Sequence, residues 1–210
     1  ESLLWLDGKL PVPEVLGYVQ NCSKAYLLMS KVKGKMLCDE AILKNENRLY
    51  KSVIAALRML WSVDKSDCPL SGGLDFLLKR ARLNVENGFV DTSSAVFSPN
   101  GFASPMDLLT WLEENRPEED LVLSHGDLCL PNILANCDGI TGLIDLGSCQ
   151  VADRYRDIAI CMRSLERNMA GLYGNTPCER SFDRAKFFEL LGVEPNEDKI
   201  RYYTLLEELS

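Results

Sequence analysis

From Ser124 to Gly147 the chain reads S-H-G-D-L-C-L-P-N-I-L-A-N-C-D-G-I-T-G-L-I-D-L-G. Two mainly apolar runs in this stretch, Asn132–Ala135 and Ile140–Ile144, are separated by Cys137-Asp138-Gly139. Runs of this kind joined by a short Asp-Gly turn are typical of a β-hairpin. Another apolar run, Leu121–Ser124, comes directly before the stretch and predicts a short strand. We therefore expect a small sheet inside a chain that elsewhere shows mostly helical periodicity.

Three polar residues of this stretch stand where a strand stops or a turn begins. Asp127 and Asn132 are five positions apart, and the hairpin would bring Asp145 back beside Asn132. Phosphoryl transfer needs a carboxylate that orients the attacking hydroxyl and accepts its proton. It also needs hard oxygen ligands that hold magnesium against the ATP phosphates. Asp127 suits the first role, and Asn132 and Asp145 suit the second.

These residues resemble the catalytic loop and the metal-binding acid of the protein-kinase-like superfamily. In detail they are similar to the aminoglycoside phosphotransferase family, whose motifs read H-G-D-x-x-x-x-N and I-D-x-G. Both occur here, as His125-Gly126-Asp127 with Asn132 and as Ile144-Asp145-Leu146-Gly147, and the family's A-D-x-x-x-D-I-A run matches residues 152–159. The resemblance implies ATP as the phosphoryl donor, Mg²⁺ as the cofactor and a hydroxyl of an aminoglycoside, a cationic antibiotic, as the acceptor.

Three further polar residues near these motifs are interpreted as structural. We expect His125 to pack and to hydrogen-bond, which would steady the loop, and not to act as a base. Asp153 and Asp157 are expected to cap helices and to hold loops in place through hydrogen bonds.

The resemblance extends over nearly the whole chain. Leu27–Ser30 looks like the family's strand that enters the hinge, which implies that backbone groups of Ser30 and Val32 bind adenine. The ending Tyr202–Ser210 is similar to the C-terminus of the aminoglycoside 3′-phosphotransferases. That similarity implies that Glu208 and the carboxylate of Ser210 bind ammonium groups of the acceptor. Glu166 is a further candidate for this role.

The expected fold class is α+β, as a protein-kinase-like two-lobed fold with a partial small β lobe and a mostly helical large lobe. Residues 1–33 would be a remnant of the nucleotide lobe with the hinge, and residues 34–210 the catalytic and substrate lobe. Strands are expected at Val12–Gln20 and, buried, at Ala25–Ser30. Glu1–Leu6 reads like the tail of a helix. Further helices are expected from Asp39 to about Val63, from Leu74 to about Val85, after Ser104 to about Glu114, and at Asp157–Leu165, Phe182–Leu191 and Glu197–Leu209. Gly88–Ala103 is expected to be irregular.

The chain departs from the family pattern in two ways. The family's phosphate-covering loop, its ATP-binding lysine and that lysine's glutamate partner would lie before Glu1, so we expect a chain that begins inside the nucleotide lobe. On the acceptor side, the acids usual in the antibiotic kinases are few. Asp91 is the one acid of its loop, Arg167 and Asn168 stand where acids are usual, Ser148 replaces an arginine found in some relatives, and residues 171–178 look inserted.

Composition excludes several classes of function. The net charge of −8 argues against nucleic acid as a partner and favours a cationic one. Eight cysteines without a C-x-x-C pair, together with a single histidine, do not suit a zinc site. Reduced thiols and the lack of a long apolar run predict a cytoplasmic protein without a membrane span.

Two alternatives to an aminoglycoside kinase stay open at this point. The acceptor could be another amino-sugar or an amino-alcohol, because the motifs specify phosphoryl transfer better than they specify the acceptor. A chain without the front of the nucleotide lobe could also be an inactive, kinase-like binding module.

Overall fold

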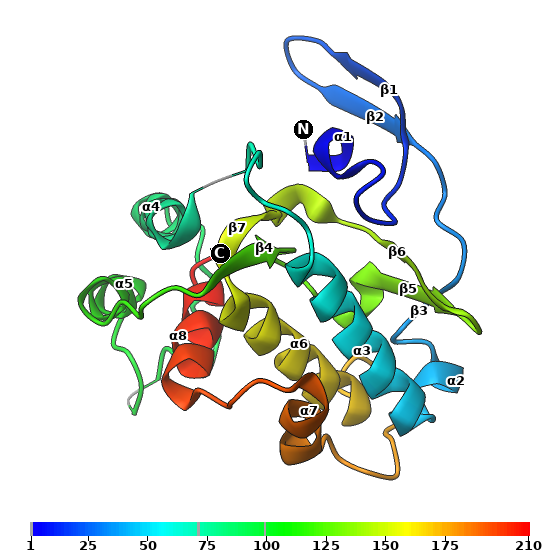
Figure 1. Ribbon diagram of the computed structural model, residues 1–210. Helices are drawn as coiled ribbons and strands as arrows, with labels where there is room; N and C mark the ends of the chain where they lie inside the picture. Colours follow the sequence, from blue (N-terminus) through cyan, green and yellow to red (C-terminus); the bar gives the residue numbers. More distant parts are fainter. Residues whose placement is uncertain (1, 71, 99) are drawn as a thin grey trace.

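The computed structural model describes residues 2–70, 72–98 and 100–210, so Glu1 and Pro99, which fall in two of the predicted segments, lie outside the described residues. A helical body carries three small antiparallel sheets (Figure 1), which confirms the predicted α+β class. The α-helices are α1 (Ser2–Leu6), α2 (Glu40–Leu43), α3 (Glu46–Trp61), α4 (Gly73–Glu86), α5 (Pro105–Glu114), α6 (Arg154–Met169), α7 (Arg184–Leu191) and α8 (Glu197–Glu207).

The three sheets are short, and two of them frame the motif segment. Strand β4 pairs with β7, and β5 forms the middle of a sheet with β3 and β6, so the predicted hairpin at 132–144 is present as β5–β6. The strands are β1 (Val15–Gln20), β2 (Ala25–Met29), β3 (Lys35–Met36), β4 (Leu121–Ser124), β5 (Ile133–Asn136), β6 (Gly139–Leu143) and β7 (Gln150–Asp153), and the two 3₁₀ turns are η1 (Leu130–Asn132) and η2 (Leu146–Ser148).

The β1–β2 hairpin differs from its prediction in burial. Both strands and the turn between them are present, and Asn21 Oδ1 accepts the N–H groups of Ser23 and Lys24, which closes the turn. All five residues of β2 are exposed, however, so the prediction of a buried strand was wrong. The physical reason is visible in Figure 1, where the hairpin projects away from the helical body.

The single long helix predicted from Asp39 is in fact two helices. Asp39 caps α2, but Asn45 then interrupts the helix and caps α3 by accepting the N–H of Arg48 at 3.1 Å. Asparagine competes with helix continuation because its side chain bonds the local backbone, and a strong cap can start a new helix.

The core lies between α3 and α6. Leu49, Val53, Leu57 and Leu60 recur at helical spacing on α3 and are fully buried. Ile158 and Leu165 of α6 belong to the same cluster. Within the described residues no helix is both long and apolar enough to cross a bilayer.

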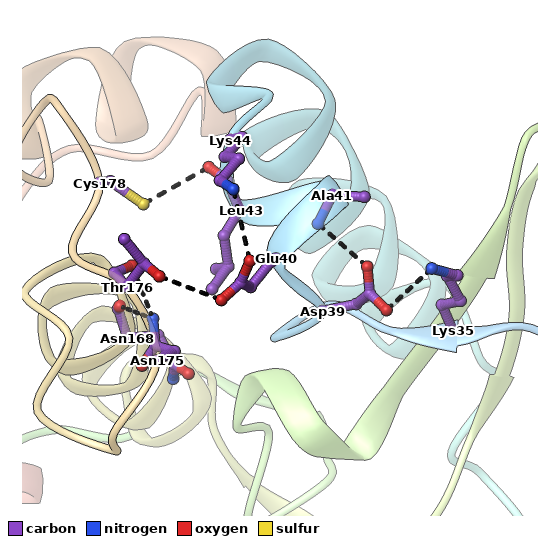
Figure 2. A network of polar contacts seen from close by, with 10 residues as sticks. All are labelled: Lys35, Asp39, Glu40, Ala41, Leu43, Lys44, Asn168, Asn175, Thr176 and Cys178. Carbon is purple, nitrogen blue, oxygen red and sulfur yellow. Dashed lines mark hydrogen bonds and ion pairs between the residues drawn. The ribbon is translucent and has the colours of Figure 1, made fainter.

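The segment at 171–178, which looks inserted in the sequence, is tied to the helical body. Figure 2 shows Thr176 donating to Glu40 of α2 at 3.1 Å and Asn175 donating to the carbonyl of Asn168 on α6 at 2.7 Å. The thiol of Cys178 lies 3.6 Å from the carbonyl oxygen of Leu43. The segment therefore covers the end of α6, and Asn168 is buried beneath it.

Candidate functional site

The loop that follows β4 is held by a buried carboxylate. The N–H groups of His125 and Gly126 donate to the two oxygens of Asp157 at 2.8 and 2.9 Å. Asp157 belongs to the first turn of α6 and is fully buried. Hydrogen bonds to an ionised group are among the strongest in proteins, so the backbone just before Asp127 is fixed by α6.

His125 links this loop to the strand that leads to Asp145. One ring nitrogen, Nδ1, accepts the N–H of Asp127 at 3.3 Å, and Nε2 lies 2.9 Å from the carbonyl oxygen of Ile144. Nε2 therefore carries the proton. Burial lowers the pKa of His125, so the ring is neutral at physiological pH. The predicted steadying hydrogen bonds of His125 are confirmed.

Asp127 and Asn132 are joined directly. The amide nitrogen of Asn132 donates to the carbonyl oxygen of Asp127 at 2.9 Å and to its carboxylate at 3.0 Å. Asn132 ends η1 and is buried, whereas Asp127 is half-buried. Because the amide nitrogen is used in these two bonds, the amide oxygen of Asn132 is the atom left to face a cation.

Asp145 lies beside this pair because of the β5–β6 hairpin. Ile133 is paired with Leu143, and the N–H of Ile144 donates to the carbonyl of Asn132 at 3.0 Å. Asp145 has a φ of 60° and is the one non-glycine in the described residues with positive φ. A left-handed backbone at an aspartate costs free energy and is found most often where function requires it.

The donor set fits magnesium better than a metal with an all-protein cage. The described residues contain no group of three or more His, Cys, Asp or Glu side chains arranged to hold a metal ion. Magnesium is usually held by one or two protein oxygens, with waters and phosphates completing its shell. The amide oxygen of Asn132 and the exposed carboxylate of Asp145 are hard oxygen donors of this kind.

Ser30 and Val32 lie where the hairpin chain meets the motif segment. Ser30 donates its N–H to the carbonyl of Glu14 at 2.9 Å, and its hydroxyl accepts the N–H of Glu14 at 2.9 Å. The Ser30 hydroxyl thus accepts the Glu14 N–H that the Ser30 carbonyl would accept in a regular antiparallel ladder. Val32 packs over β6, because a Cβ placed on Gly142 would lie 2.3 Å from Val32 Cγ1.

The three residues predicted to bind the acceptor substrate, Glu166, Glu208 and Ser210, do not all lie together. Glu208 forms an ion pair with Arg163 of α6 at 3.7 Å. The hydroxyl of Ser210 lies 3.5 Å from Arg80 of α4, so both C-terminal residues face arginines. Glu166 instead lines a cavity of about 270 Å³ between α6 and residues 177–182.

Comparisons with known proteins identify the family of this chain. The model of the phosphotransferase enzyme family matches residues 1–188. The aminoglycoside 3′-phosphotransferase of Niallia circulans is 39% identical over 99% of this chain and 76% of its own length. That of Enterococcus faecalis is 35% identical over 100% of this chain and 76% of its own length.

This chain belongs to the aminoglycoside phosphotransferase family. It spans about three quarters of the length of these relatives. The crystal structure of an aminoglycoside-3′-phosphotransferase of type VIII superposes with a TM-score of 0.82 at 29% identity, over 100% of this chain and 78% of that one. A Streptomyces rimosus aminoglycoside phosphotransferase in complex with ADP and streptomycin gives 0.76 at 25% identity, over 99% and 79%. The predicted kinase-like fold is confirmed.

One residue of the site was not predicted from the sequence. Arg156 lies in the first turn of α6, is fully buried and donates to the carbonyl of Gly126 at 2.9 Å. The signal that could have revealed it is its position on a helix whose neighbouring residues, Tyr155 and Ile158, are apolar and buried. An arginine amid such residues needs internal partners.

Proposed function

We propose that the protein transfers the γ-phosphoryl group of ATP to a hydroxyl of an aminoglycoside, with Mg²⁺ as cofactor. The observation that carries the proposal is the hydrogen-bonded pair of Asp127 and Asn132 with Asp145 beside it across the β5–β6 hairpin. The family membership and the relative in complex with ADP and streptomycin support the same reaction.

Each residue of the centre has a distinct role. Asp127 orients the acceptor hydroxyl and accepts its proton, while Asn132 keeps the Asp127 carboxylate in place. The amide oxygen of Asn132 and the carboxylate of Asp145 hold Mg²⁺, which neutralises phosphate charge when bound. Catalysis then rests on positioning and on electrostatic stabilisation.

The nucleotide is proposed to lie against the chain at the end of β2. The carbonyl of Ser30 and the N–H of Val32 would bind adenine, and Val32 already contacts the hairpin that carries Asp145. In this arrangement residues 1–33 contribute the nucleotide side and residues 34–210 contribute the catalytic and acceptor side.

All eight cysteines are free, which supports a reducing compartment such as the cytoplasm.

The acceptor is proposed to bind through its ammonium groups. Glu208 and the C-terminal carboxylate of Ser210 supply negative charge at one place, and Glu166 supplies it one turn farther along α6 than Arg163. The net charge of −8 favours the approach of a cationic acceptor.

The proposal is tested by ATP consumption in the presence of Mg²⁺ and kanamycin. We expect kanamycin-dependent turnover that falls by a factor of roughly 100 to 10,000 in Asp127→Ala, because the general base is lost. The matched control is Asp138→Ala, an exposed acid in the turn of the same hairpin, which should keep its rate. No turnover by the wild-type protein, or equal rates in Asp127→Ala, would contradict the proposal.

A second acceptor class is favoured by the ion pair between Arg163 and Glu208. The positive charge of Arg163 offsets the negative charge of Glu208, which would otherwise attract an ammonium group. An amino-sugar or amino-alcohol with fewer positive charges than an aminoglycoside would therefore suit the site. A panel of acceptors at fixed Mg²⁺ and ATP separates the two classes. Calorimetry that shows no binding of Mg–ATP to this chain would instead favour an inactive binding module.

A further inference from the structure

We propose that Arg156 and Glu207 form a positioning pair that holds the catalytic loop in register with the loop carrying Asp145. Arg156 is fully buried in the first turns of α6, and Glu207 is the last residue of α8. The proposal deepens the proposed function, on which its kinetic test rests, and it adds a role for two residues to which that function assigns no contact with phosphate or acceptor.

A single guanidinium joins three segments of the chain. Its Nη2 donates to the carbonyl of Gly126, which directly precedes Asp127, at 2.9 Å. Its Nη1 lies 3.4 Å from the carbonyl oxygen of Ser148, three residues after Asp145. Its Nε lies 3.4 Å from a carboxylate oxygen of Glu207. The planar fork of arginine fixes the directions of its N–H groups, so it sets the spacing between the two loops.

The backbone around Gly126 leaves little freedom for another arrangement. Gly126 has a φ of 81°, and a Cβ at this position would lie 2.2 Å from the carbonyl oxygen of Ser148 and 2.7 Å from Arg156 Nη1. The two loops therefore approach each other closely at Gly126, with the guanidinium at the point of contact. His125 makes the second link between the same loops through the carbonyl of Ile144.

Stability alone does not account for a buried arginine at this place. A buried ion pair loses solvation that its own attraction often fails to offset, and apolar residues of similar size are frequently as stable. Burial raises the pKa of Glu207, and the positive charges of Arg156, Arg163 and Arg80 oppose that shift. What apolar residues cannot supply is the set of N–H groups for the carbonyls of Gly126 and Ser148.

The test compares Arg156→Met, Glu207→Leu and the double variant. Each single change leaves one buried charge without its partner, so the melting temperature should fall, and the double variant should recover most of it. In the double variant we expect kcat for kanamycin phosphorylation to stay about tenfold or more below wild type, with KM for kanamycin and ATP nearly unchanged, because a displaced base slows the chemical step.

The matched control is Lys199→Met. Lys199 of α8 and Asp153, which ends β7 and caps α6, form a second, largely buried ion pair at 2.6 Å. This pair lies beside the start of β4, whereas the catalytic loop follows the end of β4. This variant should lose stability and keep kcat. A double variant whose kcat recovers together with its melting temperature would show that the Arg156–Glu207 pair is merely structural and would overturn the proposal.

A second readout does not depend on turnover. Amide hydrogen exchange of the peptide covering residues 124–132 should be about tenfold faster in the double variant than in wild type, since the loop has lost its bond from the Arg156 guanidinium. Unchanged exchange would overturn the proposal. If the wild-type protein phosphorylates no acceptor, the proposed function fails, and the exchange measurement alone decides whether the pair positions the loop.

Discussion

The catalytic loop and the β1–β2 hairpin are built in opposite ways. In the loop, backbone groups of His125 and Gly126 bond to side chains of α6 that are fully buried. The hairpin is held by its own ladder and turn, and the side chains of Leu16, Tyr26 and Leu28 are each more than half exposed. The first region is fixed by the core, and the second is not.

This difference separates the two halves of the proposed chemistry. The residues assigned to the acceptor and the metal lie on segments tied to the core, whereas Ser30 lies at the end of an exposed hairpin. A two-stranded hairpin without a packed face is only marginally stable in water. We therefore expect the hairpin to open at low free-energy cost and the catalytic loop to open only with the core.

The largest effect is expected at the carboxylate that holds the loop. Asp157→Ala should lower the free energy of unfolding by roughly 3–6 kcal/mol, because two charge-assisted hydrogen bonds are lost and two buried N–H groups stay unpaired. Urea denaturation measures this. Asp91→Ala is the matched control, since Asp91 also accepts a backbone N–H but is exposed. If Asp157→Ala and Asp91→Ala lowered the free energy of unfolding equally, the catalytic loop would not be held by Asp157 as described.

A core side chain of the strand before the loop should give the next largest effect. Leu123→Ala on β4 should cost roughly 2–5 kcal/mol, because Leu123 is fully buried and its removal leaves a cavity. Thermal unfolding followed by circular dichroism measures the loss. A cost below about 1 kcal/mol would mean that β4 does not support the loop as the structure indicates.

The single histidine makes the loop sensitive to acid. Because the pKa of His125 is lowered in the folded state, its contribution is fully present above the unfolded value of about 6.5. As pH falls below that value, His125 becomes protonated in the unfolded chain but stays neutral in the folded chain. The free energy of unfolding therefore falls by up to about 1.4 kcal/mol per pH unit. Urea denaturation at several pH values between neutral and mildly acidic conditions measures the slope.

His125→Gln is the matched control for that slope. Glutamine keeps an N–H donor and an acceptor but does not titrate, so its stability should depend less on pH in the same window. Other groups contribute equally to both proteins. The same slope in wild type and variant would contradict a neutral, buried His125.

The smallest effect is expected on the hairpin. Leu28→Ser should change the free energy of unfolding by less than about 0.5 kcal/mol, because Leu28 is 64% exposed. The measurement is the same urea titration used for Asp157→Ala. A loss above about 2 kcal/mol would show that this face of the hairpin is packed against something, and the contrast between the two regions would then fail.

The motif segment could be predicted from sequence because its information is local. The spacing of Asp127, Asn132 and Asp145 and the turn at Cys137-Asp138-Gly139 are sufficient to place the three residues around one hairpin. The start of a helix after Ser104 was likewise predictable, and Ser104 caps α5 by accepting the N–H of Asp107.

The rest depends on tertiary contacts that a single sequence does not display. The apolar pattern of Ala25–Met29 identifies a strand but cannot say whether another layer covers it. Strand β7 was missed because it begins with Gln150 and ends with Asp153, two polar residues that are buried through pairing with β4 and capping of α6. Arg156 was missed because arginines are usually exposed.

The proposed role of Asp127 is to act in phosphoryl transfer to an aminoglycoside hydroxyl. Phosphorus NMR of kanamycin incubated with the protein, Mg²⁺ and ATP tests it most directly, with the isosteric variant Asp127→Asn run beside it. We expect a phosphomonoester signal on kanamycin with the wild-type protein and almost none with the variant. A wild-type reaction without that signal, or equal signals from both proteins, would contradict it.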